Sequence, residues 1–415
     1  MHISKARYVY IILIVIYVFQ VNLLADNLCL LFFNIPGYGC NVGYDSIYIY
    51  LFPIILFLSF FIPINNKEPS SVILNILFLF CFIPAIIYFP KEIHGESGSI
   101  FLYSLYMAAS FFTLLLSSEV KINIKKINVK PYQTELILIS IAIIFILLII
   151  NAHGLKLEAP SITDVYAVRT EYKENASSLS GYAVILGGYI ISPLIILLYL
   201  NSKRILMLIG VPLVLFLTYI IFSSSGIKSI ALSIFVIVGF YYLFKKIYNF
   251  GYYLLVFINI FIFINYLIYT FITNNNIMYI HWLRRVVTSP GSTGAKFFDY
   301  FVVLGNEPTP KAPSLIANYY FSTNGSANTG FFLEGVGRFG LYGLLINTFL
   351  LSLFLILLNA ISKKIDKNLL ACLLVMVSYA MCNSSFLTVI ISYGLFLLTI
   401  ISYLLMSYPM KESDL

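Results

Sequence analysis

The sequence predicts an all-α protein that crosses a membrane many times, and three observations support this prediction. Of its 415 residues, 60% are hydrophobic and only 10% are charged, whereas soluble domains carry about 25% charged residues. Apolar runs of about 20 residues, the length of a helix that spans a bilayer, recur along the chain. Many of the 33 tyrosines and 36 phenylalanines stand near the ends of these runs, as is typical of aromatic belts at the membrane interface.

We expect about 12 transmembrane helices in a single membrane domain over residues 1–415. The predicted spans are 7–25, 46–64, 72–89, 99–117, 134–152, 182–200, 205–223, 229–245, 251–272, 339–358, 368–383 and 386–407. Lys5 and Arg7 precede the first run as in a signal peptide. The run is long and no cleavage motif follows it, so we expect a retained helix.

The basic residues predict the orientation of the chain. Lysines fill most of the short connectors on one side, which the positive-inside rule assigns to the cytoplasm together with both termini. Two larger loops, 153–181 and 273–338, then lie outside. These loops hold four of the six arginines, namely Arg169, Arg284, Arg285 and Arg338. Because a guanidinium makes forked contacts to phosphate oxygens, the external surface is predicted to receive an anion.

Two of the candidate anion-binding residues lie in short polar motifs. Arg169 follows Asp164 in the first external loop, and Lys228 stands in SSSGIKS between two predicted spans. Each is a candidate for holding a phosphate. The structural alternatives are that Arg169 makes local ion pairs on a solvated helix, and that Lys228 extends from the bilayer edge towards water.

A second group of candidates opens the other external loop, in HWLRRVVTSPG. Arg284 and Arg285 follow a predicted span on the outside, against the usual inside bias, which favours a functional role over a role as interfacial anchors. His281 is a candidate proton acceptor. The structural alternative is that His281, which is next to Trp282, lies at the membrane interface without a catalytic role.

The segment 335–340, GVGRFG, formally matches a dinucleotide-binding fingerprint. No strand is expected before it and a membrane span follows it, so that interpretation fails. Its glycines are expected to let the next helix pack closely. Glu334 and Arg338 stand four residues apart and would share a helix face. They form either a local ion pair or a site in which Glu334 is the base and Arg338 holds the anion. Asp299 and His281 are the other candidate bases.

Several classes of site are absent from the sequence. There is no metal-ligand spacing, phosphate-binding P-loop, nucleophile elbow or nucleic-acid motif. We therefore expect no metal, no cofactor and no nucleic-acid partner. Without a metal, arginines would have to neutralise any phosphate charge.

At these residues the chain resembles the O-antigen polymerase (Wzy) family of oligosaccharide repeat-unit polymerases. The resembling pieces are DVYAVRTEY, SGIKS, RRVVTSPG with FFDYF, and ANTGFFLEGVGRFGLYG, spread over residues 160–345. The resemblance implies a GT-C-like membrane glycosyltransferase with two large periplasmic loops, here 153–181 and 273–338. It implies a bacterial inner-membrane enzyme that joins undecaprenyl-diphosphate-linked oligosaccharide units, as donor and acceptor, into O-antigen or a similar surface polysaccharide. A chain-length regulator protein and membrane lipids are the further partners expected.

The residue chemistry fits this implied reaction. Charge develops on the leaving lipid diphosphate, and fixed arginines stabilise it, while the acceptor hydroxyl needs a base within hydrogen-bond reach. Two alternatives stay open. A lipid-linked oligosaccharide flippase or other transporter would carry charges within its spans, which are almost charge-free here. An O-antigen ligase would share the lipid-diphosphate chemistry.

Overall fold

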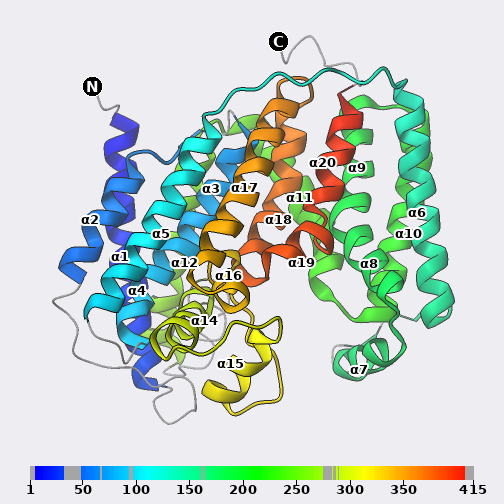
Figure 1. Ribbon diagram of the computed structural model, residues 1–415. Coiled ribbons are helices and arrows are strands. Elements are labelled where there is room, and N and C mark those ends of the chain that lie inside the picture. The colour runs from blue at the N-terminus through cyan, green and yellow to red at the C-terminus, as the bar shows by residue number, and fades with distance from the viewer. Residues whose placement is uncertain are drawn as a thin grey trace. The chain divides into compact units, whose positions relative to one another are not determined.

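The computed structural model describes residues 5–31, 48–65, 68–92, 97–158, 160–161, 164–273, 283, 287 and 289–406. Regular structure in these residues is entirely helical (Figure 1). Ten helices within the described chain are long and apolar enough to cross a bilayer, so this is a multi-pass membrane protein. Large apolar side chains such as Phe19 and Phe235, 68% and 75% exposed, face outwards from these helices, as expected where lipid is the solvent.

The first half of the chain contains most of the long helices. They are α1 (Lys5–Leu31), α2 (Tyr48–Ser59), α3 (Pro69–Leu77), η1 (Phe78–Phe82), α4 (Ile83–Glu92), α5 (Ser97–Ser118), α6 (Pro131–His153), α7 (Val165–Asn175), α8 (Ser178–Leu186), η2 (Gly187–Ile191), α9 (Ser192–Ser202) and α10 (Ile205–Ser225). Consecutive helices such as α3, η1 and α4 form one continuous span.

The second half contains the short helices of the polar segment. The elements are α11 (Lys228–Lys246), α12 (Phe250–Ile268), η3 (Tyr269–Thr273), α14 (Ser289–Phe298), η5 (Asp299–Val303), α15 (Ala312–Phe321), α16 (Phe331–Phe339), α17 (Leu341–Ser362), α18 (Lys367–Asn383), α19 (Phe386–Ile391) and α20 (Leu395–Leu405). None of α14 to α16 belongs to a candidate span.

Ten of the twelve expected spans correspond to long apolar helices of the described chain. The expected spans 46–64 and 368–383 are represented by shorter helices, α2 with 12 residues and α18 with 17 residues. At a rise of about 1.5 Å per residue, these cover less than the roughly 30 Å of a hydrocarbon core. Twelve crossings therefore stay a prediction.

Two spans contain a π-helical turn directly before a proline. η1 ends at Phe82, two residues before Pro84, and η2 ends at Ile191, two residues before Pro193. A proline inside a helix lacks an N–H and its ring collides with the carbonyl four residues earlier. A wider turn moves that carbonyl away from the ring, so each span continues through its proline.

By contacts, the chain divides into two compact units. Unit 1 contains residues 1–121, 249–356 and 378–386, and unit 2 contains residues 122–248, 357–377 and 387–415. α1 to α5, α12 and α14 to α16 thus belong to unit 1, and α6 to α11 belong to unit 2. The single membrane domain expected over residues 1–415 stays a prediction.

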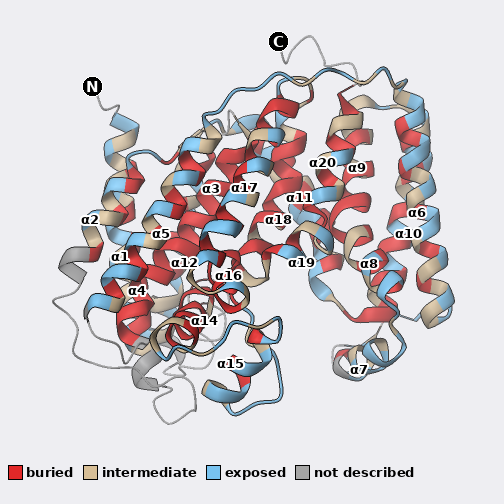
Figure 2. Ribbon diagram, in the orientation of Figure 1, coloured by how far each residue is buried: buried red, intermediate tan, exposed pale blue. Residues whose placement is uncertain are grey.

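In unit 1, α14 packs against α4 at very short range. A Cβ added to Gly291 would lie 2.5 Å from the carbonyl oxygen of Pro84, so only glycine fits at this crossing. At the other end of α14, the Phe298 ring meets the stacked rings of Phe89 and Tyr103 edge-on, with centroids 5.2 and 5.1 Å away. These contacts bury α14 almost completely (Figure 2) and hold Asp299, the next residue, in place.

Candidate functional site

The segment 289–339 of unit 1 concentrates buried charge outside the candidate spans. Lys296, Asp299 and Glu334 are 2%, 3% and 2% exposed. A buried ion costs several kcal/mol of desolvation unless other groups compensate it. The segment contains none of the long apolar helices. Nothing in its packing requires ionisable side chains in the interior. Their burial makes this segment the leading candidate for a site.

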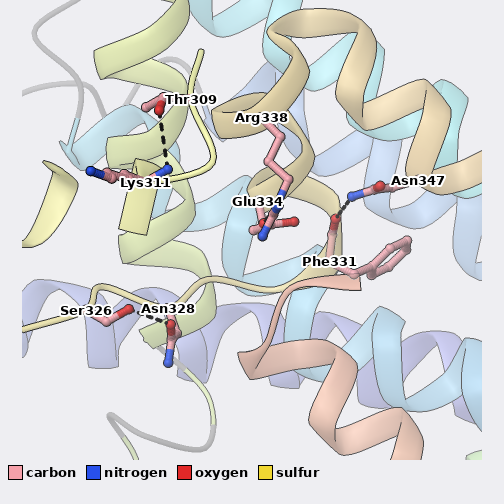
Figure 3. Close-up of polar contacts among 8 residues, drawn as sticks. All are labelled: Thr309, Lys311, Ser326, Asn328, Phe331, Glu334, Arg338 and Asn347. Carbon is pink, nitrogen blue, oxygen red and sulfur yellow. Dashed lines mark hydrogen bonds and ion pairs between the residues drawn. The ribbon is translucent and has the colours of Figure 1, made fainter. Parts of the chain in front are cut away.

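Glu334 and Arg338 form an ion pair along one turn of α16. The Nε of Arg338 donates to Oε1 of Glu334, and the two side chains are 25% and 3% exposed (Figure 3). Burial raises the pKa of Glu334, and Arg338 opposes this shift. The shared helix face expected from their spacing is confirmed, and the contact is the local ion pair that the sequence left as one of two alternatives.

Close glycine packing positions this pair. The chain reverses at Gly340, which has a φ of 64°, and a Cβ on Gly343 would overlap the carbonyl oxygen of Gly335. Asn347 on α17 donates its Nδ2 to the carbonyl oxygen of Phe331 at 2.7 Å (Figure 3). The motif GVGRFG is thus a helix-to-helix packing motif, and α17 contacts α16 at its first residue and at its middle.

Asp299 is held by a tyrosine from a different helix. The hydroxyl of Tyr320, on α15, donates to Oδ2 of Asp299 at 2.5 Å. Burial and this hydrogen bond both raise the pKa of Tyr320, so the hydroxyl keeps its proton and remains a donor. The other carboxylate oxygen, Oδ1, is buried and has no hydrogen-bond partner. Because buried polar atoms are nearly always paired, this oxygen is available for a further donor.

Lys296 lies one turn before Asp299 on the same continuous helix. Its Nζ is 3.2 Å from Oγ of Ser292 and 5.5 Å from the centroid of the Phe321 ring. Burial lowers the pKa of the Lys296 ammonium to about 7, and the Asp299 carboxylate opposes the shift. A lysine with such a pKa changes its charge near neutral pH, which an exposed lysine does not.

The helices that carry these two pairs pack directly against each other. A Cβ added to Gly337 of α16 would lie 2.8 Å from the ring of Phe297 on α14. Gly294 of α14 in turn faces Leu333 of α16. The backbones of α14 and α16 therefore lie close together. The helix that carries Lys296 and Asp299 is the immediate neighbour of the helix that carries Glu334 and Arg338.

In unit 2, Arg169 holds a helix end. Its Nε and Nη2 donate to the carbonyl oxygen of Gly226 at 3.3 and 3.2 Å. Gly226 ends α10 in the left-handed conformation, and a cation near a helix C-terminus is electrostatically favourable. A Cβ on Gly226 would lie 3.2 Å from the carbonyl oxygen of Val165. α7 therefore docks on the SSSGIKS turn, and two motifs that the sequence singled out separately lie together.

Lys228 is the first residue of α11 and is exposed. Next to it, the hydroxyl oxygens of Ser229 and Tyr189 are 2.7 Å apart. On α7, Glu171 makes an ion pair with Lys156 at 2.7 Å. Unit 2 thus carries Arg169 and Lys228 around one turn, while Asp299, Glu334 and Arg338 lie in unit 1.

The remaining site predictions, His281, Arg284 and Arg285, lie outside the residues that the structure describes. Sequence reasoning singled out neither Lys296 nor Tyr320. The spacing of Lys296 and Asp299, three residues apart and directly after a run of small side chains, was an available signal. Tyr320 is 21 positions from Asp299, and no local pattern joins them.

Neither a metal centre nor a known relative guides the assignment further. Among the described residues, no group of three or more His, Cys, Asp or Glu side chains could hold a metal ion. Comparison with protein-family models, curated proteins and solved structures yields no match. The arrangement of the side chains is therefore the basis for inferring a function.

Proposed function

We propose that this protein is a membrane glycosyltransferase that polymerises oligosaccharide repeat units carried on undecaprenyl diphosphate. The observation that carries the proposal is the burial of Lys296, Asp299 and Glu334 in a segment outside the candidate spans. Enzymes bury ionisable groups where a proton must move or a charge must be stabilised. The resemblance to the Wzy family supplies the substrate class.

The reaction has one bond formed and one bond broken. A hydroxyl oxygen of the acceptor repeat unit attacks the anomeric carbon of the growing chain, and the bond from that carbon to the lipid diphosphate breaks. The base removes the hydroxyl proton. The electron pair leaves with the diphosphate, whose developing negative charge requires fixed cations nearby. A carboxylate can remove the proton, and a guanidinium close to it can stabilise the charge on the diphosphate.

The contacts of the two described candidate bases support different roles for them. Glu334 accepts from Arg338, whereas Asp299 keeps one buried carboxylate oxygen without a hydrogen-bond partner. This favours Asp299 as the group that accepts the proton and Glu334 as the group that orients Arg338. In this proposal Arg338 contacts the diphosphate. Arg169, Lys228, Arg284 and Arg285 stay the other candidate anion-binding residues that the sequence predicts.

The proposal also includes the location of the protein. A bacterial inner-membrane protein with cytoplasmic termini and twelve crossings would expose residues 153–181 and 273–338 to the periplasm. A GT-C-like arrangement, lateral access for two lipid-linked substrates and a chain-length regulator belong to the same proposal. The lysines of the short connectors support the orientation.

Deletion and complementation in the native strain test the function, with the surface glycan separated as a ladder on a gel. Loss of the protein should leave single repeat units at the surface and remove the longer bands. Loss of a ligase would remove even the single-unit band, and loss of a flippase would trap units inside the cell. Either of these last two patterns would replace the polymerase proposal.

A point variant sharpens the same assay. Arg338→Ala should abolish the ladder, and Lys311→Ala, which removes an exposed cation from the same segment, should preserve it. Both variants are checked for membrane insertion. An intact ladder from Arg338→Ala would show that this guanidinium does not serve the diphosphate.

A further inference from the structure

Three tyrosines form an aromatic group on α15 and η5. The ring centroids of Tyr300 and Tyr319 are 5.1 Å apart at 69°, and those of Tyr319 and Tyr320 are 4.8 Å apart at 72°. These edge-to-face contacts are the favourable geometry for aromatic pairs. We call Tyr300, Tyr319 and Tyr320 the tyrosine platform.

One ring of the platform, that of Tyr319, is exposed in a segment outside the candidate membrane spans. Tyr319 is 60% exposed, and α15 lies beyond the ends of the long helices of unit 1 (Figure 1). Much of α15 is exposed (Figure 2). Exposed tyrosine rings supply rigid contact area with little loss of conformational entropy, which is why they are enriched in binding surfaces.

The platform is joined to the buried carboxylate. Tyr320 contributes its ring to the platform and its hydroxyl to Oδ2 of Asp299 at 2.5 Å. Asp299 is 3% exposed, and its Oδ1 has no hydrogen-bond partner. Tyr320 therefore connects the rings of the tyrosine platform to the Asp299 carboxylate, one oxygen of which has no hydrogen-bond donor.

We propose that the tyrosine platform binds a sugar ring of the oligosaccharide substrate. The inference rests on the proposed function and names the part of the site that takes the acceptor unit. A pyranose has a face of C–H groups and an edge of hydroxyls. The exposed Tyr319 ring covers such a face, with the electron-rich surface that favours C–H contacts. The adjacent carboxylate accepts from a hydroxyl, as ionised acceptors do strongly.

A membrane-interface anchor is the competing role for an exposed tyrosine. An anchor requires only the ring and hydroxyl of a single residue. It does not require a buried carboxylate with an oxygen that lacks a donor. This feature favours a ligand surface, and the experiment below separates the two roles by binding.

The test uses the full-length protein in detergent and the free repeat-unit oligosaccharide, released from the native strain's surface glycan, as the probe. Saturation-transfer NMR and titration calorimetry measure binding to the wild type and to three variants. Tyr319→Ala should weaken binding by about fivefold to tenfold, the loss expected for one aromatic face. Tyr319→Phe should bind as the wild type does, since the ring provides the contact.

Tyr253→Ala is the matched control. Tyr253 is 48% exposed and also makes an edge-to-face pair, with Tyr252 at 5.3 Å, but on the membrane span α12. Its removal should leave binding unchanged. The proposal is overturned if the wild type fails to bind the oligosaccharide, if Tyr319→Ala binds normally, or if Tyr253→Ala loses as much affinity. Thermal melting of each variant excludes unfolding, and Tyr319→Phe reports on the ring if Tyr319→Ala is unstable.

The glycan ladder distinguishes failure of this inference from failure of the proposed function. A ladder that depends on the protein, together with normal binding by Tyr319→Ala, keeps the polymerase and removes the platform. A ladder that survives deletion, together with lost binding by Tyr319→Ala, keeps the saccharide platform and removes the polymerase.

Discussion

Arg338 and Glu334 illustrate how a buried pair constrains single substitutions. Removing one partner leaves an uncompensated charge, which costs about 3 kcal/mol for a pair as buried as this one. Arg338→Ala should therefore destabilise the protein, because the carboxylate of Glu334 is 3% exposed. The double variant Glu334→Gln with Arg338→Met should restore most of the lost stability while remaining inactive.

Thermal melting in detergent, followed by the glycan ladder, measures both parts of this prediction. A double variant that melts as low as Arg338→Ala would show that the pair stabilises the fold through its own attraction. A double variant that makes polymer would remove both side chains from the chemistry.

Lys296 predicts a pH dependence of stability. Burial lowers its pKa to about 7 in the folded protein, whereas an unfolded lysine titrates near 10.4. Between these values the unfolded chain binds more protons, so stability should rise with pH from about 7 to about 10, with a slope of at most about 1.4 kcal/mol per pH unit. The contribution is constant below the folded pKa.

The variant Lys296→Met isolates this contribution. It should be more stable than the wild type at pH 7, and the difference should shrink as the pH rises to 9. Melting temperatures across this range, in one detergent and at constant ionic strength, provide the comparison. A difference that does not change with pH would show that Lys296 stays charged when folded.

Residue spacing predicted some of these contacts and missed others for identifiable reasons. Glu334 and Arg338 are four residues apart on one helix, so local geometry alone predicted their shared face. Asp299 meets Tyr320 only because α15 folds back onto η5, which no spacing reveals. The Nε and Nη2 of Arg169 donate to the Gly226 carbonyl oxygen, a contact that the sequence did not predict. Every residue has a backbone carbonyl oxygen, so the sequence does not indicate which of them accepts a hydrogen bond from a given arginine.

At the scale of the element, α14 depends on one glycine. A Cβ on Gly291 would lie 2.5 Å from the carbonyl oxygen of Pro84, so Gly291→Ala should push α14 away from α4. Overpacking of this kind costs about 1–3 kcal/mol, and it should lower activity because Asp299 directly follows α14. Gly239→Ala, in a helix where nothing lies within 4 Å of the added Cβ, should be neutral or stabilising by up to about 1 kcal/mol.

Melting temperatures and ladder intensity measure the two glycine variants side by side. Equal stability of Gly291→Ala and Gly239→Ala would contradict the close crossing of α14 and α4.

The docking of α7 predicts a local effect of Arg169. Arg169→Ala removes both donors to Gly226 and should loosen α7 without unfolding the spans. Hydrogen bonds from a charged donor contribute about 1.5–3 kcal/mol, so trypsin cleavage after the exposed Lys173 should accelerate at least several-fold. Glu174→Ala, an exposed change on the same helix, should not alter the rate. An unchanged rate in Arg169→Ala would leave α7 held by other contacts, such as the Lys156–Glu171 pair.

The elements differ in how far hydropathy predicts them. Ten long apolar helices follow expected spans, because burial in lipid demands an uninterrupted apolar run. The last of these ten, which corresponds to the expected span 386–407, is interrupted between α19 and α20, where Gly394 adopts a φ of 78°. The π turns before Pro84 and Pro193 were also not expected. Hydropathy reports composition along a segment and says little about its backbone path.

At the scale of the whole molecule, the division into two units was not foreseen. Each unit is assembled from three separate stretches of chain, and α17 and α18 both contribute to unit 1 and unit 2. No composition shift or linker marks such a boundary, because the spans of both units share the same lipid environment. Sequence alone predicts which segments enter the membrane, and tertiary contacts decide which of them pack together.

The expected orientation of the chain can be tested at its two larger loops. Twelve crossings from a cytoplasmic N-terminus place residues 153–181 and 273–338 on the same side of the membrane. A membrane-impermeant maleimide should therefore label both Glu174→Cys and Lys311→Cys in intact spheroplasts. Lys125→Cys should react only after the membrane is disrupted. All three positions are exposed in the structure.

The background for this labelling is a chain in which Cys29 and Cys40 are replaced by serine. The remaining cysteines, Cys81, Cys372 and Cys382, are buried and should not react. If α2 does not cross the membrane, the number of crossings before both loops falls by one, so both loops lie on the cytoplasmic side and only Lys125→Cys is labelled in intact spheroplasts. α18 follows both loops and does not change their side. Labelling of both loops supports the expected orientation, and labelling of only Lys125→Cys contradicts it.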